Sequence, residues 1–568
     1  MLRTFFTFLN GQNLLRALIF VLWLGFTQIG ILVAQTATNG TTDNPAPLSI
    51  NNNTNVVEGM STPTNAIEVS QPAANAPIAP APVTAPASTP SLTSSEIRAE
   101  SDGSSGSSRL SGWLVLAPLL TLASIGGFLL YQCGQSRAKN CGHTSTLLLV
   151  GLVFGLIGYW MGGFAVQMGG VGDAHAALVQ SVLPSEKSTL DHELGFRFLG
   201  HYWSYMGSSG FFLITDETSR NATAALFLSQ AVLLAIAVAA ALGAALERGR
   251  LLAMAITAFL IGALIYPLFA NWVWGGGWLA EMGREFGLGH GFVDLAGAGV
   301  VHETAGTLAL VIAMALGPRY GKFGRNKSIN SIPGHNMPFL LLGAMILLIS
   351  WTATNAFAYS NSGLAAVNAL LAAAGGALIS FLIAAGQKQA PQPALLCRGL
   401  LGGIISIFAC SALIDPWAAF VIGILAGLII QFTIHFVEER GIDDPMGAIS
   451  VHGAGGAWGV LAAGLFANGT AGKGINGIDG PVRGLLLTGD WHQLAAQAIG
   501  GITCFVVVFI LGYACLSLIQ KILGNRVELA DEVHGLDWTQ TGAFGYQGDI
   551  DSEEISRGKG DRESEPVK

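Results

Sequence analysis

Eleven apolar stretches follow one another from residue 112 onward, and most of them reach the ~20 residues that a helix needs to cross a bilayer. They span 112–132, 145–168, 223–246, 251–273, 295–317, 337–358, 363–386, 397–413, 416–437, 446–468 and 493–522. Only 11% of the 568 residues are charged, against about 25% in soluble domains. Such a chain cannot cover a water-facing surface, so we predict an all-α integral membrane protein with 11 transmembrane helices.

The connections between these stretches differ in positive charge. If the first stretch enters from outside, the odd-numbered connections face the cytoplasm; they hold Arg137, Lys139, Arg248, Arg250, Arg319, Lys322, Arg325, Lys327, Lys388, Arg398 and Arg440. The even-numbered connections, although longer in total, hold only Lys187, Arg197, Arg220, Arg284, Lys473 and Arg483. The positive-inside rule therefore predicts a multi-pass protein of the cell (inner) membrane, with its N-terminus outside and its C-terminus in the cytoplasm.

The first hundred residues differ from the rest. Arg3 and Arg16 precede an apolar run over 17–34 that is followed by small and polar residues, which predicts a signal peptide over residues 1–37. An uncleaved anchor helix is the alternative. Residues 38–110 are rich in Ser, Thr, Pro and Ala, so we expect a disordered extracytoplasmic arm. The transmembrane domain is expected over 111–523, with a cytoplasmic tail over 524–568.

Several other classes of function are disfavoured. The net charge of −8 comes without a basic face, which argues against nucleic acid as a partner. The six cysteines show no CxxC pattern, and we interpret them as small apolar residues. The run His302-Glu303-Thr-Ala-Gly lacks the second histidine of an H-E-x-x-H zinc helix. We therefore predict no enzyme activity, no cofactor and no bound metal.

A pattern of 13 residues, D-x-x-G-A-x-x-V-H-x-x-x-G, occurs twice. It runs from Asp294 to Gly306 and again from Asp444 to Gly456, at the start of the fifth and tenth stretches. Two halves of five helices each would then be related, and because five is odd they are inverted in the membrane, as in many transporters. The predicted architecture is an inverted 5+5 helix repeat with an eleventh helix added.

The repeat also predicts where its histidines lie. His302 and His452 each follow their aspartate by eight residues, or about 12 Å along a helix. The two helices start from opposite faces of a hydrocarbon core ~30 Å thick, so the imidazoles differ in depth by roughly 6 Å. Ionisable groups inside a bilayer usually mark a polar path or relay, which favours function over simple packing for this pair. For Asp294 and Asp444, capping of a helix N-terminus is the simpler interpretation.

Eight segments together resemble the ammonium transporter (Amt/Mep/Rh) family over residues 112–548. They are LYQCGQSRAKN (130–140), LERGR (246–250), YPLFANWVWGGG (266–277), GFVDLAGAGVVH (291–302), GPRYGKF (317–323), IPGHNMP (332–338), DDPMGAISVHGAGG (443–456) and HGLDWTQTGAFGY (534–546). The last of them has Thr541 where the family motif has a histidine.

The resemblance implies a homotrimer with one narrow pore through each subunit. Ammonium would be recruited at an outer aromatic vestibule and deprotonated, and ammonia would pass two hydrogen-bonded histidines. The histidine pair falls on His302 and His452, and the vestibule on Trp274, Asp294 and Tyr266. Trp351, Asn355 and Asp444 match lining or supporting positions. In this family the tail can also meet a PII-type regulatory protein at the cytoplasmic face.

Three positions depart from the family pattern. Leu233 and Thr354 stand where the family has its outer and inner gate phenylalanines, and Ala358 stands where it has a vestibule serine. A local shift could bring Phe227 or Phe357 into the pore instead. These changes leave an ammonium sensor with little or altered transport as the alternative to a channel-like transporter.

Overall fold

The computed structural model describes residues 115–171, 190–198, 200–326, 328–358 and 362–546. The predicted signal peptide and N-terminal arm, and the end of the tail after residue 546, lie outside the described residues. All the elements named below belong to one compact unit, which is residues 108–568.

The prediction of an all-α membrane protein is confirmed. Ten helical segments among the described residues are long and apolar enough to cross a membrane. They are Val115–Gln135, Ala138–Met168, Arg220–Ala245, Leu251–Phe286, Ala298–Leu316, Met337–Phe357, Ser362–Gly386, Pro416–Glu439, Ile449–Phe466 and His492–Ile522.

The predicted count of eleven spans is not confirmed, because the eighth stretch (397–413) is not one long helix. Helix α16 ends at Ile405, and turns follow it through residue 413. There the backbone carbonyls of Phe408 and Ala409 accept hydrogen bonds from the N–H groups of Ala296 and Leu295, at 2.8 and 3.4 Å. These carbonyls thus bond to the loop before the fifth span and not within a helix of their own.

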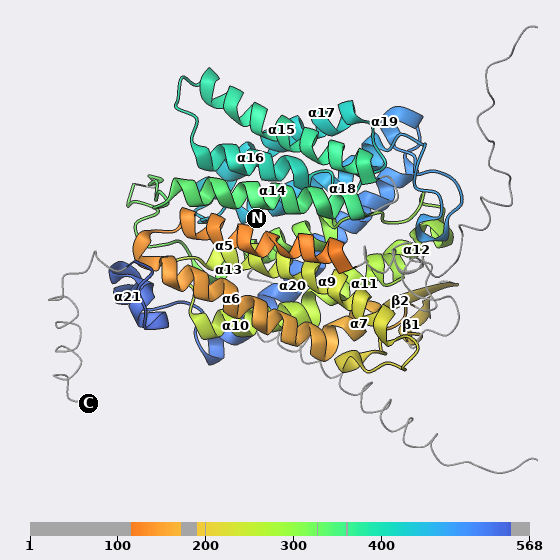
Figure 1. The fold of residues 1–568 in the computed structure, drawn as a ribbon, viewed down its shortest axis with the longest axis horizontal. Helices are drawn as coiled ribbons and strands as arrows, with labels where there is room; N and C mark the ends of the chain where they lie inside the picture. The colour runs from red at the N-terminus through yellow and green to blue at the C-terminus, as the bar shows by residue number, and fades with distance from the viewer. Residues whose placement is uncertain (1–114, 172–189, 199, 327, 359–361, 547–568) are drawn as a thin grey trace, which may run out of the picture. The chain divides into compact units, whose positions relative to one another are not determined.

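The helices that form the spans run between two ends of the bundle (Figure 1). In chain order they are α5 (Ser124–Gln135), α6 (Cys141–Gly158), α7 (Phe164–Met168), α9 (Arg220–Leu242), α10 (Leu251–Leu260), α11 (Tyr266–Trp274), α12 (Trp278–Phe286), α13 (Thr304–Leu316), α14 (Met337–Phe357), α15 (Ser362–Gly386), α16 (Pro393–Ile405), α17 (Pro416–Glu439), α18 (Gly455–Phe466) and α20 (His492–Ile522). Two π-helical segments, η6 (Ala298–Glu303) and η7 (Ile449–Ala454), lead into α13 and α18.

We call one end of the bundle the hairpin side. It holds the antiparallel strands β1 (Glu193–Phe198) and β2 (His201–Gly207), together with α12 and the short helix α19 (Leu485–Thr488). The indole N–H of Trp272, on α11, donates to the backbone carbonyl of Tyr205 at 2.9 Å. This bond ties the hairpin to the end of the fourth span.

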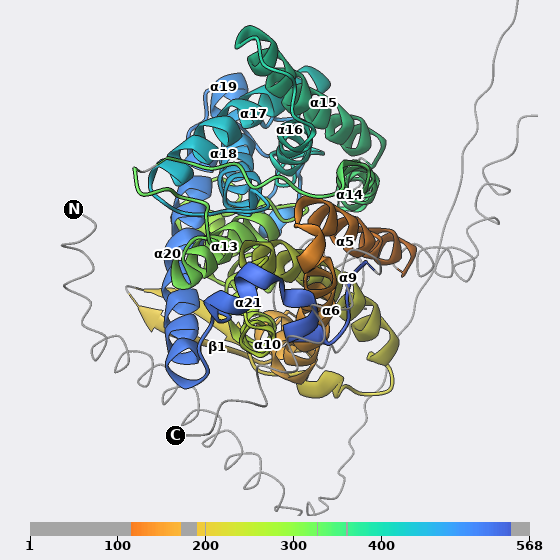
Figure 2. The ribbon, with the colours of Figure 1, turned by 90° about the vertical axis from the view of Figure 1, so that its left-hand side faces the viewer.

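The opposite end, the tail side, holds the turns 136–140, 246–250 and 317–336 and the C-terminal helix α21 (Leu529–His534). Figure 2 looks onto this side, with α21 in front. Asp537, just beyond α21, accepts the backbone N–H of His143 at 2.8 Å, and Asn140 accepts that of Leu536 at 2.9 Å. The first part of the tail is therefore held against the beginning of α6.

The two copies of the repeat cross at their glycines. A Cβ atom added to Gly306 would lie 2.0 Å from the backbone nitrogen of Gly453, and one added to Gly456 would lie 2.6 Å from that of Glu303. Only glycine permits such an approach, as is common where membrane helices pack. Each copy thus supplies the glycine that lets the other copy come close.

A side chain at Gly306 is expected to separate the two copies. In a Gly306→Val variant the Cβ atom itself would lie 2.0 Å from the backbone nitrogen of Gly453, so we expect several degrees of thermal destabilisation. Gly126, on α5, is the control because a Cβ there meets nothing within 4 Å; Gly126→Ala should keep the thermal stability of the wild type. Wild-type thermal stability of Gly306→Val would contradict the expectation.

Candidate functional site

The crossing of the two repeats brings two histidines into contact. The Nδ1 atoms of His302 and His452 lie 2.9 Å apart, and both residues are buried. One Nδ1–H donates to the other Nδ1, so each imidazole turns its Nε2 atom away from its partner. The histidines occupy the same position of the repeat, and they lie within η6 and η7. π-Helical turns are rare overall, but those that occur often lie at functional sites. Neither of these two π-helical segments could be recognised from the sequence.

Aromatic side chains surround the pair. The ring of Trp351 meets both imidazoles edge-on, with centroids 5.1 Å from His302 and 5.8 Å from His452. Phe408 meets His302 edge-on at 4.6 Å, and Phe128 stacks on His452 at 6.0 Å. The resemblance implied a lining or supporting position for Trp351 but indicated neither Phe128 nor Phe408, because a phenylalanine within an apolar stretch carries no signal of its own.

Several polar atoms near the pair have no hydrogen-bond partner among the described residues. They are Nε2 of His302, Nε1 of Trp351 and Oδ1 of Asn355, all buried. The amide nitrogen of Asn355 donates to the carbonyl of Trp351 at 2.9 Å, which fixes the orientation of that side chain. Buried polar atoms are normally paired, so this group of unpaired atoms suits a small polar solute that can donate and accept.

Of the residues predicted for the vestibule, Asp294 precedes η6, and Trp274 and Tyr266 belong to α11. The indole N–H of Trp274 donates to the backbone carbonyl of Asp294 at 2.7 Å. The carboxylate of Asp294 accepts four backbone N–H groups, those of Gly297, Ala298, Gly299 and Val300, at 2.7–2.9 Å. Tyr266 is buried, and its hydroxyl has no partner among the described residues.

Asp444 has the equivalent place in the second copy. Its carboxylate accepts the N–H groups of Ala448 and Ile449, at 2.9 and 2.8 Å. The glycine three residues after each aspartate has a positive φ, +106° for Gly297 and +74° for Gly447. Only glycine takes this conformation at no steric cost, which explains why the repeat contains D-x-x-G. Both aspartates thus cap a helix start.

The three altered family positions carry no aromatic ring. Thr354 is buried, and its hydroxyl lies 3.0 Å from that of Thr121 and donates to the carbonyl of Ser350 at 2.9 Å. Leu233 and Ala358 are partly buried and pack on the core. Phe227 packs between Tyr159 and Phe164, at centroid distances of 5.5 Å to each, and Phe357 is 37% exposed.

The whole membrane region matches a known protein family. The model of the Ammonium Transporter Family matches residues 112–546. The chain belongs to this family. Ammonium transporter Amt2 of Archaeoglobus fulgidus is 32% identical over 441 residues, which are 76% of this chain and 87% of Amt2. Ammonium transporter 1 member 3 of Solanum lycopersicum is 27% identical and covers 76% of this chain and 92% of its own length.

Solved structures agree with this assignment. A structure named Sensor Amt Protein superposes with a TM-score of 0.64 at 27% identity, covering 76% of this chain and 98% of its own. Mep2 of Candida albicans shares the fold, with a TM-score of 0.60, 24% identity, and coverage of 78% of this chain and 91% of its own. Since the relatives are ammonium transporters, the prediction that the chain is not an enzyme is confirmed.

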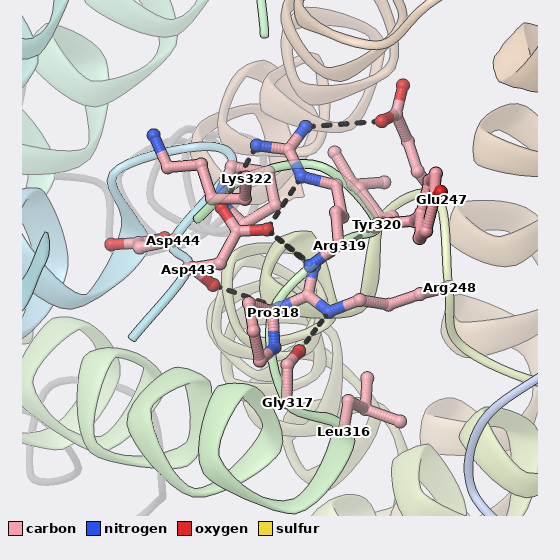
Figure 3. Close-up of polar contacts among 12 residues, drawn as sticks. Glu247, Arg248, Leu316, Gly317, Pro318, Arg319, Tyr320, Lys322, Asp443 and Asp444 are labelled. Carbon is pink, nitrogen blue, oxygen red and sulfur yellow. Dashed lines mark hydrogen bonds and ion pairs between the residues drawn. The ribbon is translucent and has the colours of Figure 1, made fainter. Parts of the chain in front are cut away.

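A second polar cluster of this family member lies on the tail side and was not predicted from the sequence (Figure 3). The guanidinium of Arg319 donates to both oxygens of Asp443, at 2.8 and 3.0 Å, and to Glu247 at 3.2 Å. The guanidinium of Arg137 donates to the same oxygen of Glu247, Oε2, at 2.9 Å. Arg248, fully buried, donates to the carbonyls of Gly317 and Asp443, at 2.8 and 2.9 Å. The cluster therefore joins the ends of four spans.

Charge pairing dominates the electrostatics of this cluster. Burial by itself would raise the pKa of Asp443, but the hydrogen bonds and charge of Arg319 and the charge of Arg248 outweigh it and lower that pKa to about 2. The pKa of Glu247 is likewise lowered: burial opposes the shift, and the charges of Arg319 and Arg137 prevail. Both groups are therefore carboxylates at neutral pH.

The low pKa of Asp443 predicts a loss of stability in acid. Because the folded-state pKa of about 2 lies below the ordinary value of 3.8 for an aspartate, this stabilisation is complete above about pH 5 and is lost as the pH falls towards 2. The expected loss is about 2 kcal/mol. Thermal unfolding in a non-ionic detergent between pH 5 and 2.5 should show it. Asp443→Asn should be less stable at pH 5 and change less with pH; an equal slope would contradict the assignment.

Proposed function

We propose that this chain is a channel-like ammonium/ammonia transporter, a homotrimer with one pore through each subunit. Ammonium is recruited at the vestibule of Trp274, Asp294 and Tyr266 and deprotonated there. Ammonia then passes the histidine pair towards the tail side. The observation that carries this proposal is the hydrogen-bonded pair His302–His452, buried inside the membrane spans and enclosed by aromatic rings.

The physical chemistry of the site supports this order of events. A permanent charge at the centre of a bilayer costs at least a few kcal/mol, whereas neutral ammonia avoids most of that cost. Two neutral imidazoles joined through Nδ1 offer one donor and one acceptor through their Nε2 atoms. They can therefore hydrogen-bond ammonia without adding charge to the path. The face of the Trp274 ring suits a cation before deprotonation.

The same proposal includes the membrane location and the orientation of the protein. The excess of Lys and Arg in the turns of the tail side favours a cytoplasmic position for that side, so the hairpin side faces outwards and the signal peptide directs insertion into the cell membrane. Nitrogen uptake follows as the physiological role. A PII-type regulatory protein would reach the tail side, where the tail is held on α6.

A sensor is the second candidate, and the gate positions favour it. Thr354 and Leu233 carry no ring, and Thr354 is hydrogen-bonded to Thr121, so the inner and outer gates differ from the family pattern. The Sensor Amt Protein is also among the similar structures. Tight ammonium binding without flux is the expected behaviour of a sensor.

Flux through purified protein tests the proposal. Full-length protein in liposomes that contain a pH-sensitive dye should take up ammonia faster than empty liposomes after an ammonium jump. Binding of ammonium to the same preparation is measured by calorimetry. Flux equal to empty liposomes together with measurable binding would replace the transporter by the sensor, and the absence of both would reject each of them.

A further inference from the structure

A carboxyl group stands beside the histidine pair without a cationic partner. Glu303 follows His302 directly, ends η6 and lies within the span Ala298–Leu316. It is 4% exposed, and its Oε2 atom has no hydrogen-bond partner among the described residues. It takes part in none of the ion pairs that the described residues form. The run HETAG does not make this residue part of a zinc helix, so its presence calls for another explanation.

Glu303 faces away from the pore lining. Its carboxylate oxygens lie 3.6 and 3.7 Å from where a Cβ of Gly501 would stand, on α20. A Cβ of Gly456, on α18, would lie 2.6 Å from its backbone nitrogen. His302, by contrast, meets Trp351 and Phe408. The carboxyl thus lies in the seam between η6, α18 and α20, which pack against one another.

The titratable groups around this seam cannot neutralise a negative charge. Asp294, which precedes η6, is itself acidic, and its carboxylate is occupied by backbone N–H groups. Cys504, on α20, interacts with the carbonyl of Gly299 and the hydroxyl of Thr304. On η6 itself, His302 is engaged with His452. From α18, the described residues at the seam are glycine and valine, with no charge.

The face of α20 that meets the seam carries polar side chains between the hairpin side and the level of Glu303. Gln493 donates to the carbonyl of Gly291 at 2.8 Å, and Gln497 donates to the carbonyls of Val293 and Val460, at 2.8 and 3.0 Å. These two glutamines, Gly501 and Cys504 are spaced by three or four residues and so share one helix face. The polar groups of this face are paired, whereas the Oε2 atom of Glu303 is not.

An unpaired carboxylate inside a bilayer is costly, whereas a neutral carboxylic acid is tolerated. We propose that Glu303 is a proton-binding site of this transporter, distinct from the histidine pair: it holds its proton at neutral pH and releases it in alkali. Its ionisation then places a negative charge one residue from His302. That charge favours cations over neutral ammonia in the pore, so Glu303 sets how much of the transport carries charge.

Proton binding can be tested without any transport, so its outcome is independent of the proposed function. Infrared spectra of the full-length protein in lipid should show the carbonyl stretch of a buried, protonated carboxylic acid at pH 7, and this band should fade in alkali. Glu303→Gln should lack the band. Glu285→Gln is the control, because Glu285 is paired with His201 at 2.7 Å on the hairpin side, and it should keep the band. A wild-type spectrum without the band, or a band that survives in Glu303→Gln, would overturn the proposal.

A second measurement needs no variant. A hydrophobic carbodiimide reacts with protonated carboxylic acids from within the bilayer, so peptide mass analysis of the treated wild-type protein should find Glu303 modified at pH 7 and less modified in alkali. Absence of modification at both pH values would count against a protonated acid. This test remains decisive if Glu303→Gln fails to fold.

The effect on transport rests on the proposed function. The ratio of current to ammonia uptake is measured in proteoliposomes from pH 6 to 10. The ratio in wild type, divided by the ratio in Glu303→Gln at the same pH, should rise on the order of tenfold in alkali, as expected for a new charge near the pore. This quotient removes the change with pH in the proportion of ammonium to ammonia, which affects both proteins equally. Equal profiles would show that the proton site does not govern transport. If the infrared and labelling results are as expected but the protein gives no flux, the proton-binding site is supported and the proposed transport function is rejected.

Discussion

Replacing His302 and His452 by alanine is expected to abolish the current that, on the proposed function, an ammonium jump produces in proteoliposomes of the wild-type protein. The imidazoles are the polar groups that meet at 2.9 Å in the enclosure of Phe128, Trp351 and Phe408. Without them a proton or cation would cross an apolar segment at a cost of a few kcal/mol, which lowers the rate on the order of a hundredfold. Uptake of neutral ammonia is expected to persist.

The control is His435→Ala, since His435 is exposed on α17, and its current should match wild type. A double variant that conducts like wild type would mean that charge crosses the membrane by another path. If wild type itself gives no current, electroneutral ammonia passage or sensing remains, and uptake measured with the pH-sensitive dye on the same vesicles separates these two.

Replacing Arg319 by methionine is expected to destabilise the fold by about 3–5 kcal/mol. This guanidinium bridges Asp443 and Glu247, and both carboxylates are buried at the junction of the tail-side turns. Its removal leaves them less compensated, which costs more than the lost hydrogen bonds themselves. Denaturant unfolding of the detergent-solubilised protein, followed by intrinsic tryptophan fluorescence, measures the change.

Two further variants separate charge from packing. Arg325→Met removes an exposed arginine of the same turn and should change stability by less than about 0.5 kcal/mol. The triple variant Arg319→Met, Asp443→Asn, Glu247→Gln removes the unpaired charges and should recover part of the loss. A single Arg319→Met variant as stable as wild type would show that the cluster does not hold the four span ends together.

The repeat in the sequence predicted that His302 and His452 lie at similar depths, and the family resemblance implied that they are hydrogen-bonded to each other. The distance of 2.9 Å between their Nδ1 atoms agrees with both. Capping by Asp294 and Asp444 was also the simpler interpretation, because an acceptor before a helix start satisfies free N–H groups. The sequence also showed the same spacing of the glycines within the two copies of the repeat. Their roles in the positive-φ turn and at the crossing of the two copies became clear only from the backbone structure.

Other features of the site depend on contacts between residues far apart in the chain. Phe128 and Phe408 contact the histidines from the first span and from the turns after α16. Arg319 binds Glu247 and Asp443, which lie 72 and 124 residues away in the sequence.

The hydropathy of residues 397–413 predicted a full span, yet two backbone carbonyls of this stretch accept hydrogen bonds from the loop before η6. The length and composition of apolar stretches indicate membrane spans, and an internal repeat indicates symmetry, so the sequence by itself determined the membrane fold and the similar depths of the two histidines. Which side chains surround that pair, and which charges neutralise one another, only the tertiary structure decided, because both depend on pairings between helices that no local pattern records.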